Sequence, residues 1–347
     1  MQHPRLNLGL VGFTAEQRAL VEQFLALQAN FASEGVPKKS SFRSPIPWQI
    51  THHQEANALL LSTQHASLDA QQIVRFPADS KYSDVVGVRP SELRIPYALV
   101  GNMGQSQQAW MALDAPRIDL GNAMSLKIAL EKFEGALHGV RSLFAMAQLL
   151  QTRQTEIDDR HTFHLVRRGL LEAVVDVAGR RVMMRNSQQP EALEEAYWLS
   201  RPLSANTLPP GFTQWSMDEL AWTYAQHSIS VSLPKRFLSL PIYLRQPPKV
   251  RPWMIYPRQM DLLEFLGQQP RTYPQLAQAF PVQSDLLQRD LSLLLACRAI
   301  TTTPPKDIAE PPSSLPGWAD QLGFSEAEAQ AHSKLPFELK TMRSGLY

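Results

Sequence analysis

The stretch that organises this chain is Leu233–Arg258, LPKRFLSLPIYLRQPPKVRPWMIYPR. It contains six prolines, four aromatic residues and six basic residues, and it has no acidic residue. Each proline fixes its backbone angle φ, so the composition predicts an extended, stiff segment, which we call the strap. The strap residues suited to contact an anion or a partner are Lys235, Arg236, Arg245, Lys249, Arg251, Trp253 and Arg258.

Two interpretations of the strap remain open. It can be a structural connection whose cations meet acids elsewhere in the chain, such as Glu191, Glu194 and Glu195. Alternatively, its cations bind a nucleotide, a nucleic acid or a protein partner, since guanidinium groups suit phosphate and carboxylate oxygens.

The bulk composition limits what the rest of the chain can do. The 347 residues carry a formal net charge of only +2, so bulk charge does not hold the protein on nucleic acid or on an anionic membrane. Such a length accommodates two or three domains. The one cysteine, Cys297, lies in an apolar run, where we expect a buried side chain. We find no signal-peptide pattern and no apolar run of roughly 20 residues, and we expect a soluble, cytoplasmic protein.

The residues after the strap predict three helices and a strand. The predicted elements are a helix from Pro257 to Gly267, helices over Pro274–Phe280 and Asp285–Arg298, and a strand over Ala299–Thr303. This order, in residues 259–303, resembles a winged helix-turn-helix domain. A proline-rich tail, residues 304–347, follows it and includes a short predicted helix.

The winged-helix resemblance implies that the third helix could read DNA. That helix offers Gln283, Gln288 and Arg289, but Asp285 and Asp290 lie among them. Residues 259–300 have a net charge of −1, which is unfavourable for a surface that must displace counterions from DNA. A protein-contact module is therefore the favoured interpretation, and DNA binding is the alternative.

The first 122 residues alternate short apolar runs with helical patterns. The runs predict strands over Leu6–Phe13, Trp48–Thr51, Ala58–Ser62, Ile73–Phe76 and Tyr97–Val100. Thr14, with Gln17 three residues later, predicts a helix start. This alternation favours a parallel sheet with helices on both faces.

The order of these elements resembles a response-regulator receiver domain, and residues 115–137, APRIDLGNAMSLKIALEKFEGAL, resemble its last strand, loop and helix. The residues at the positions of receiver chemistry are Gly12, Phe13, Ser62, Gly101, Gly121 and Asn122. None is a carboxylate, a side chain that magnesium binding requires. The resemblance therefore implies a receiver-like fold that is not phosphorylated and that serves dimerisation or docking.

A heptad pattern follows within Ser125–Arg153 and predicts one long helix in segment 123–157. Its seam residues with dimerisation potential are Phe133, Leu137, Val140 and Phe144. The helix either packs on its own domain or pairs with a second copy, which would make the protein a homodimer.

Residues 158–232 predict a small α+β module. We expect a hairpin of His164–Val177 and Arg180–Arg185, and helices over Glu191–Leu199 and Met217–His227. Arg181 and Arg185 have a spacing that resembles the arginine pair of PilZ domains, which bind cyclic dinucleotides, although the other element of that family is not recognisable.

We find no pattern of catalysis or of metal binding. His161 and His164, near Asp158 and Asp159, have no distant ligand set to complete a metal site. The glycines of Gly101–Gly104 lack the rest of a dinucleotide-binding pattern. We therefore expect no cofactor, no metal and no enzyme activity; an enzyme with an unrecognised site is the least favoured class.

The predicted fold class is multidomain α/β and α+β. It combines a receiver-like (flavodoxin-like) doubly wound parallel sheet with a small α+β middle module and a winged-helix-like C-terminal module. The predicted function is a non-catalytic signalling adaptor or regulator that binds a protein or an anionic ligand. The alternatives are a DNA-binding transcription regulator and a cyclic-dinucleotide effector.

Overall fold

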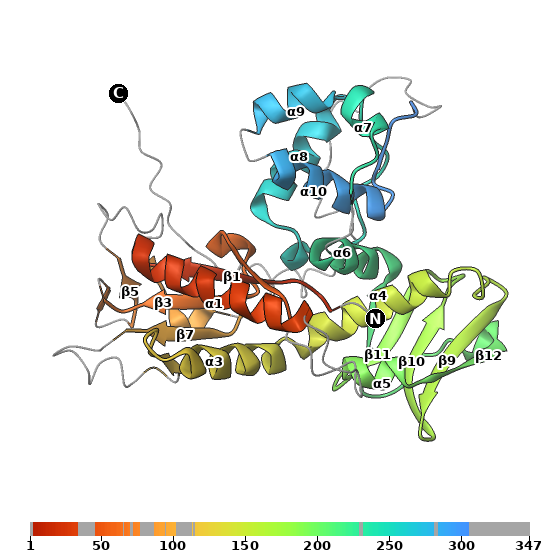
Figure 1. The fold of residues 1–347 in the computed structure, drawn as a ribbon. Helices are drawn as coiled ribbons and strands as arrows, with labels where there is room; N and C mark the ends of the chain where they lie inside the picture. Colours follow the sequence, from red (N-terminus) through yellow and green to blue (C-terminus); the bar gives the residue numbers. More distant parts are fainter. Residues whose placement is uncertain are drawn as a thin grey trace. The chain divides into compact units, whose positions relative to one another are not determined.

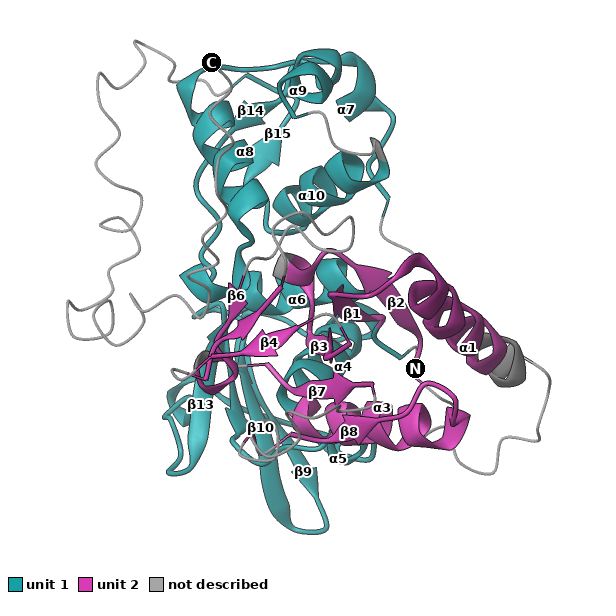
Figure 2. Cartoon of the chain, turned by 90° about the vertical axis from the view of Figure 1, so that its left-hand side faces the viewer, with its two compact units in different colours: residues 1–4, 139–332 teal, residues 5–138, 333–347 magenta. Residues whose placement is uncertain are grey.

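The computed structural model describes residues 3–33, 46–64, 66–69, 72–76, 87–93, 95–101, 113, 115–228, 232–280 and 284–304. The chain forms two compact units (Figure 2). The described residues of unit 2 lie within 5–138, and those of unit 1 are 3–4 and 139–304. Gln283 and the tail after Pro304 lie outside the described residues.

Unit 2 is built on a five-stranded parallel sheet. In spatial order its strands are β2 (Trp48–Thr51), β1 (Leu6–Val11), β3 (Ala58–Ser62), β7 (Tyr97–Val100) and β8 (Arg117–Ile118). All residues of β1 and β3 are buried, as expected for the continuous apolar strands of a parallel sheet. The mixed α/β class with a parallel sheet is thus confirmed.

The two faces of this sheet carry different layers. In Figure 2, helices α1 (Ala15–Ser33) and α3 (Ala123–Ala136) lie on one side of the sheet. A small antiparallel sheet lies on the other: β4 (Ser67–Leu68), β5 (Val74–Arg75) and β6 (Gly87–Val88). The core there is made by Leu59, Leu61, Leu99, Val74, Phe76 and Val88.

One expectation for unit 2 needs correction. The run Ile73–Phe76 was expected in the parallel sheet, but its strand β5 belongs to the small antiparallel one. The expectation of helices on both faces stays a prediction, because the connections 77–86 and 102–112 lie outside the described residues. Short 3₁₀ turns, η1 (His53–Glu55) and η2 (Pro90–Glu92), stand in the connections.

The single long helix expected over 125–153 is instead two helices, α3 and α4 (His138–Thr152). Leu137 separates them, because its φ of −91° and ψ of 17° depart from helical values. Its N–H still donates to the carbonyl of Phe133 at 2.9 Å, which closes the last turn of α3. A heptad pattern in the sequence does not detect such a one-residue break.

Unit 1 begins with α4 and a five-stranded antiparallel sheet. In spatial order its strands are β12 (Tyr197–Pro202), β9 (His161–Arg167), β10 (Leu170–Asp176), β11 (Arg181–Arg185) and β13 (Phe212–Ser216). The remaining elements are α5 (Pro190–Glu194), η3 (Leu203–Ala205) and α6 (Met217–His227).

The expected hairpin is only partly correct. The run His164–Val177 is divided between β9 and β10 by a turn at Arg168 and Gly169, whose φ values are 50° and 77°. Two consecutive positive φ values are typical of a tight hairpin turn. Similarly, the helix expected over Glu191–Leu199 ends at Glu194, and β12 follows it.

One face of this sheet packs on α4 and α6 in a common core, and the other is crossed by the connection from β12 to β13. His164 Nε2 lies 2.8 Å from the carbonyl oxygen of Ala205, and Asn206 donates to Asp176 at 2.9 Å. These contacts hold the connection on the sheet.

The C-terminal part of unit 1 follows the prediction closely (Figure 1). Its elements are α7 (Arg236–Ser239), β14 (Tyr243–Leu244), η4 (Pro252–Met254), α8 (Pro257–Gln268), α9 (Tyr273–Ala279), α10 (Ser284–Ala296) and β15 (Ile300–Thr301). The three expected helices agree within two residues at each end. β15 pairs with β14, so the strap supplies a strand of this module.

The strap is part of the core and not a surface linker. Six of its apolar residues are buried in one cluster with Trp222 of α6 and leucines of α8, α9 and α10: Leu233, Phe237, Ile242, Val250, Met254 and Ile255. The Trp222 indole N–H donates to the carbonyl of Met254 at 3.1 Å. Because Leu220 of the same helix α6 lies in the core of the antiparallel sheet, α6 joins the two parts of unit 1. Within the described part of the chain, no helix is long and apolar enough to cross a bilayer.

Candidate functional site

The carboxyl edge of the parallel sheet is where a receiver-like domain would do its chemistry. Gly12 follows β1 there with φ of 74°, and a Cβ atom on it would lie 2.3 Å from the ring of Phe76. Ser62 is fully buried at the end of β3. Gly101 follows β7 with φ of 118°. The Phe76 ring therefore lies against the position that corresponds to the receiver's acidic pair.

The polar groups at this edge contact one another. Gln17 donates to Gln64 Oε1 at 2.8 Å, and the Ser62 hydroxyl donates to Gln17 Oε1 at 3.4 Å. Thr14 and Gln17 form the expected reciprocal cap of α1, each side chain accepting from the other's backbone N–H. These amides and hydroxyls are neutral, and the contacts supply no carboxylate cluster for Mg²⁺.

Gly121 and Asn122 also have a structural role. The Asn122 side chain accepts from the backbone N–H of Met124 at 3.0 Å and so caps α3. The N–H of Gly121 donates to Asp119 Oδ1 at 2.9 Å. The loop that holds a lysine-proline pair in receivers thus forms a helix start here.

Two strap cations are bound to acids of their own unit. Arg251 lies 3.1 Å from the buried carboxylate of Glu219, and Arg258 contacts both oxygens of buried Asp290 at 2.6 and 3.0 Å. The acids named in the sequence interpretation are used elsewhere, since Glu191 pairs with Arg141 and Glu195 with Arg167. Pairing with acids was a correct expectation for these two cations, but the named partners were wrong.

The other strap cations are exposed. They are Lys235, Arg236, Arg245 and Lys249. Within the described ranges none of them has an acid at ion-pair distance; the Arg236 guanidinium lies 5.4 Å from the ring of Phe237.

One group of strap residues comes together on the surface of unit 1. The Arg251 guanidinium stacks on Trp215 of β13, 4.1 Å from the ring centre, and its Nη2 donates to the carbonyl of Gln214 at 2.6 Å. Trp253 contacts the same indole edge-to-face at 6.4 Å and remains 46% exposed. We call Trp215, Lys249, Arg251 and Trp253 the Trp253 surface. The sequence analysis missed Trp215, because only the register of β13 places it beside the strap.

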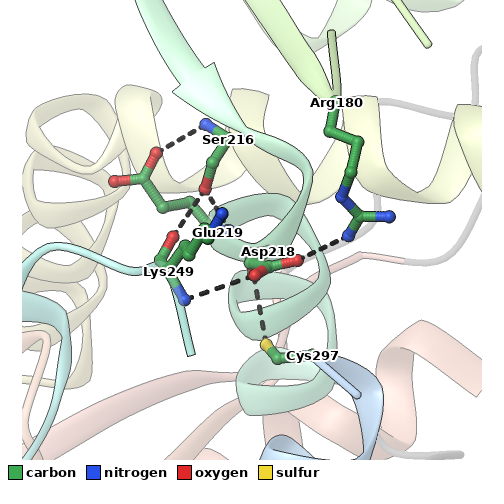
Figure 3. Close-up of polar contacts among 6 residues, drawn as sticks. All are labelled: Arg180, Ser216, Asp218, Glu219, Lys249 and Cys297. Atoms are coloured by element: carbon green, nitrogen blue, oxygen red, sulfur yellow. Dashed lines mark hydrogen bonds and ion pairs between the residues drawn. The ribbon is translucent and has the colours of Figure 1, made fainter. Parts of the chain in front are cut away.

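A polar network around the buried side chain of Asp218 fixes this surface to the rest of unit 1 (Figure 3). Asp218, at the start of α6, accepts from Arg180 at 2.8 Å and from the backbone N–H of Lys249 at 3.2 Å. The hydroxyl of Ser216 donates to the Lys249 carbonyl at 2.7 Å. The thiol of Cys297, after α10, donates to the backbone carbonyl of Asp218 at 3.3 Å. The network joins β13, α6, the strap and the segment after α10.

Burial raises the pKa of two groups of this network, the carboxyl group of Glu219, which is hydrogen-bonded to Ser216, and the thiol of Cys297. Desolvation raises the pKa of Glu219 above its usual value, and the opposing attraction of Arg251 does not cancel the effect. Burial likewise raises the pKa of the Cys297 thiol far above its ordinary value. Cys297 is therefore a buried neutral thiol, and thiolate chemistry is disfavoured there.

Helix α10, which corresponds to the DNA-reading helix of the winged-helix interpretation, packs against other elements of unit 1. Residues 290–294 of α10 are buried. Arg289 donates to the backbone carbonyl of Gln226 in α6, and Gln288 lies 3.5 Å from the Tyr273 hydroxyl. Gln288 and Arg289, the two proposed base-reading residues that the structure describes, therefore both contact other residues of unit 1.

The two arginines of β11, Arg181 and Arg185, are also paired with acids of the same sheet. Arg181 pairs with Asp176 at 2.9 Å, and Arg185 lies 3.7 Å from Glu172 and donates to the carbonyl of Leu171 at 2.6 Å. Both acids are almost fully buried. A phosphate would have to displace these carboxylates.

The histidine pair makes separate contacts. His161 Nδ1 lies 2.9 Å from Asp158, a contact that lowers the pKa of this aspartate, and His164 contacts the Ala205 carbonyl. Throughout the residues that the structure describes, no three histidine, cysteine or acidic residues are grouped as metal ligands.

The seam residues already pack within the single chain. Phe133 contacts Trp48 edge-to-face at 6.3 Å in unit 2, and Phe144 stacks on Tyr224 at 5.3 Å in unit 1. Leu137 is buried and Val140 is partly buried. Dimerisation through the seam stays a prediction, but two of its aromatic residues have partners without a second copy.

Comparisons with protein-family models, with curated proteins and with solved structures gave no match. The function is therefore inferred from the site alone.

Proposed function

We propose that this protein is a non-catalytic regulatory adaptor that binds a protein partner through the Trp253 surface. The observation that carries the proposal is the 46% exposed indole of Trp253, held against Trp215 in a well-packed part of unit 1. Tryptophan and arginine are the residues most enriched among the energetically dominant contacts of protein interfaces. A fixed indole also binds a partner with little loss of side-chain entropy.

The local charge favours a protein over a phosphate ligand. Arg251 is paired with Glu219 and Arg180 with Asp218, so both cations are largely neutralised within the unit. Lys249 is the remaining exposed cation of the surface. A nucleotide would require several unpaired donors, whereas a protein partner needs an aromatic anchor with a polar rim.

For unit 2 we propose a receiver-like domain that has lost phosphorylation. Numbered along the chain, the strands of its sheet have the order 2-1-3-4-5, which supports a flavodoxin-like arrangement. The lack of carboxylates at Gly12, Phe13, Ser62 and Gly101, and the Phe76 ring over Gly12, support the loss of chemistry. Such a domain would act by docking in signal transduction.

Site-directed crosslinking tests the adaptor proposal. A photo-crosslinking amino acid replaces Trp253 in the full chain, in the cells that make it. Leu240, on the same strap and 45% exposed, receives it as the matched control. We expect a discrete protein adduct from position 253 and none from position 240. Adducts at both positions, or at neither, would contradict the proposal.

The alternatives have their own measurement. Duplex DNA at low salt, or a cyclic dinucleotide, is added to the wild type and to Trp253→Phe while tryptophan fluorescence is followed. We expect neither ligand to change the fluorescence of either protein. A salt-sensitive change with DNA would favour the transcription-regulator alternative, since phosphate contacts are strongest at low salt. A response to the cyclic dinucleotide would favour the effector alternative.

A further inference from the structure

Strand β12 is an edge of the antiparallel sheet of unit 1 and has an unusually exposed surface. Five of its six residues are exposed, including Tyr197 at 72% and Leu199 at 38%. Leu203, just after the strand, is 43% exposed. An edge strand with unpaired backbone groups and apolar side chains is a template for pairing with another strand.

The opposite edge of the same sheet, β13, is partly covered by the strap. Gln214 of β13 gives its backbone carbonyl to Arg251 of the strap. The strap thus covers part of the β13 edge, and in the described residues β12 has no strand beyond it. Natural sheets cover, charge or interrupt their edges. In β12 the cation Arg201 and the proline Pro202 lie at the end of the strand, and residues 197–200 are uncharged, so this part of the edge is open to pairing with another strand.

Pro202 reveals which backbone groups of β12 point outward. It lies opposite His161 of β9, and without an N–H it cannot form a hydrogen-bonded pair there. Hydrogen-bonded and non-hydrogen-bonded pairs alternate along an antiparallel ladder. The backbone N–H and C=O groups of Trp198 and Ser200 therefore point away from β9, toward the open edge.

We propose that two copies of this chain pair through β12, antiparallel, about a two-fold axis at Leu199. In this register Trp198 of one copy faces Ser200 of the other, so both outward sets of groups are matched. Symmetry then gives about four backbone hydrogen bonds between the copies. The two antiparallel sheets become one continuous sheet.

Side-chain chemistry supports this register. Leu199 faces Leu199 of the second copy, and Tyr197 faces Arg201 of the second copy, which places a guanidinium beside an aromatic ring. Because β12 has one cation and no acid, no like charges oppose each other.

Neighbouring registers fit less well. An axis at Ser200 would place Pro202, which lacks a donor, opposite Trp198, and would place Leu199 opposite Arg201. An axis at Trp198 would need Ala196, whose N–H is already bonded to the carbonyl of Leu193 at 3.3 Å. An axis between two residues would shift the pairing by one position, and the paired side chains would then point to opposite faces of the sheet.

The proposal is independent of the Trp253 surface and is tested by the mass of the full chain in solution. Sedimentation equilibrium over a wide concentration range should give a monomer–dimer equilibrium for the wild type. Leu199→Arg places two cations face to face at the axis and should produce a monomer. Leu208→Arg, at a 53% exposed leucine away from β12, should leave the dimer intact.

Ser200→Pro is the second variant. It removes an outward N–H without breaking a bond to β9, and proline is tolerated at such edge positions. It should also be monomeric, with an unchanged circular dichroism spectrum.

Disulfide formation tests the register. Leu199→Cys should form a linked dimer under mild oxidation, because the two residues face each other. Ser200→Cys, one residue away from the axis, should not. A monomeric wild type at the highest concentration, a dimer that survives both Leu199→Arg and Ser200→Pro, or equal linking of the two cysteine variants would overturn the proposal.

Discussion

The ion pair of Arg258 and Asp290 is predicted to be a major determinant of the stability of the C-terminal part of unit 1. The Asp290 side chain is 2% exposed, and its oxygens accept from Arg258 at 2.6 and 3.0 Å and from Gln259 at 3.0 Å. The strap ends at Arg258, and Asp290 lies in the middle of α10. The pair therefore ties the start of α8 to α10.

Arg258→Met keeps most of the apolar stem of the side chain and removes its charge. The carboxylate of Asp290 then stays buried with Gln259 as its remaining partner among these contacts. Removal of one partner of a buried ion pair costs about 3–5 kcal/mol, mostly because the other charge is left without compensation. We expect a loss of this size in the free energy of opening of the α10 backbone amides, measured by hydrogen exchange with mass spectrometry.

A double-mutant cycle separates this effect from lost packing. Asp290→Asn added to Arg258→Met removes the unpaired charge, so the double variant should be less destabilised than the two single losses added together. Arg167→Met is the matched control, because its partner Glu195 is 51% exposed at the side chain and such pairs contribute about 0–1 kcal/mol. If Arg258→Met costs no more than Arg167→Met, the burial argument is refuted.

Two further predictions concern Gly12 and Glu219. Gly12→Ala should destabilise unit 2 by about 2–4 kcal/mol, because φ is positive and the new methyl group meets Phe76. Gly135→Ala, in open space on α3, should instead stabilise by about 0.5–1 kcal/mol; thermal unfolding of both variants checks this contrast. Because burial raises the pKa of Glu219, its contribution favours folding at low pH and is lost as the pH rises through the folded-state pKa. The urea midpoint of the wild type should therefore fall relative to that of Glu219→Gln as pH increases from about 4, and a relative gain would contradict the assignment.

Local signals in the sequence predicted local structure well. The helix expected over Met217–His227 is α6 with the same bounds, and the reciprocal cap of Ser216 and Glu219 begins it. The start of α8 at Pro257 follows from the tolerance of proline in the first helical turn. These features depend on residues three or four positions apart, so no tertiary information is needed.

Features that depend on competition between distant segments were not predicted. Residues 197–199 had been assigned to a helix, but they pair with β9, and strand pairing overrides a weak helical pattern. The heptad seam was correctly recognised as apolar, but Phe133 and Phe144 face the cores of two different units. A one-dimensional pattern identifies an apolar stripe without identifying what covers it.

The same limit applies to the functions considered for unit 1, because a sequence pattern does not show which polar residues pack inside the unit. A winged-helix pattern implies a third helix with a free outer face, and DNA reading requires that face. In this fold Asp290 of α10 accepts from Arg258, and Arg289 of α10 donates to a backbone carbonyl of α6. These polar residues of α10 therefore stabilise the unit. The strap changes role for a related reason, because its apolar residues complete the core and two of its cations neutralise buried acids. What remains for a partner is the part of the strap that neither role uses, and there the exposed side chain with the largest apolar surface is Trp253. The proposed protein-binding function therefore rests on what internal packing leaves exposed, and not on the net charge of the strap.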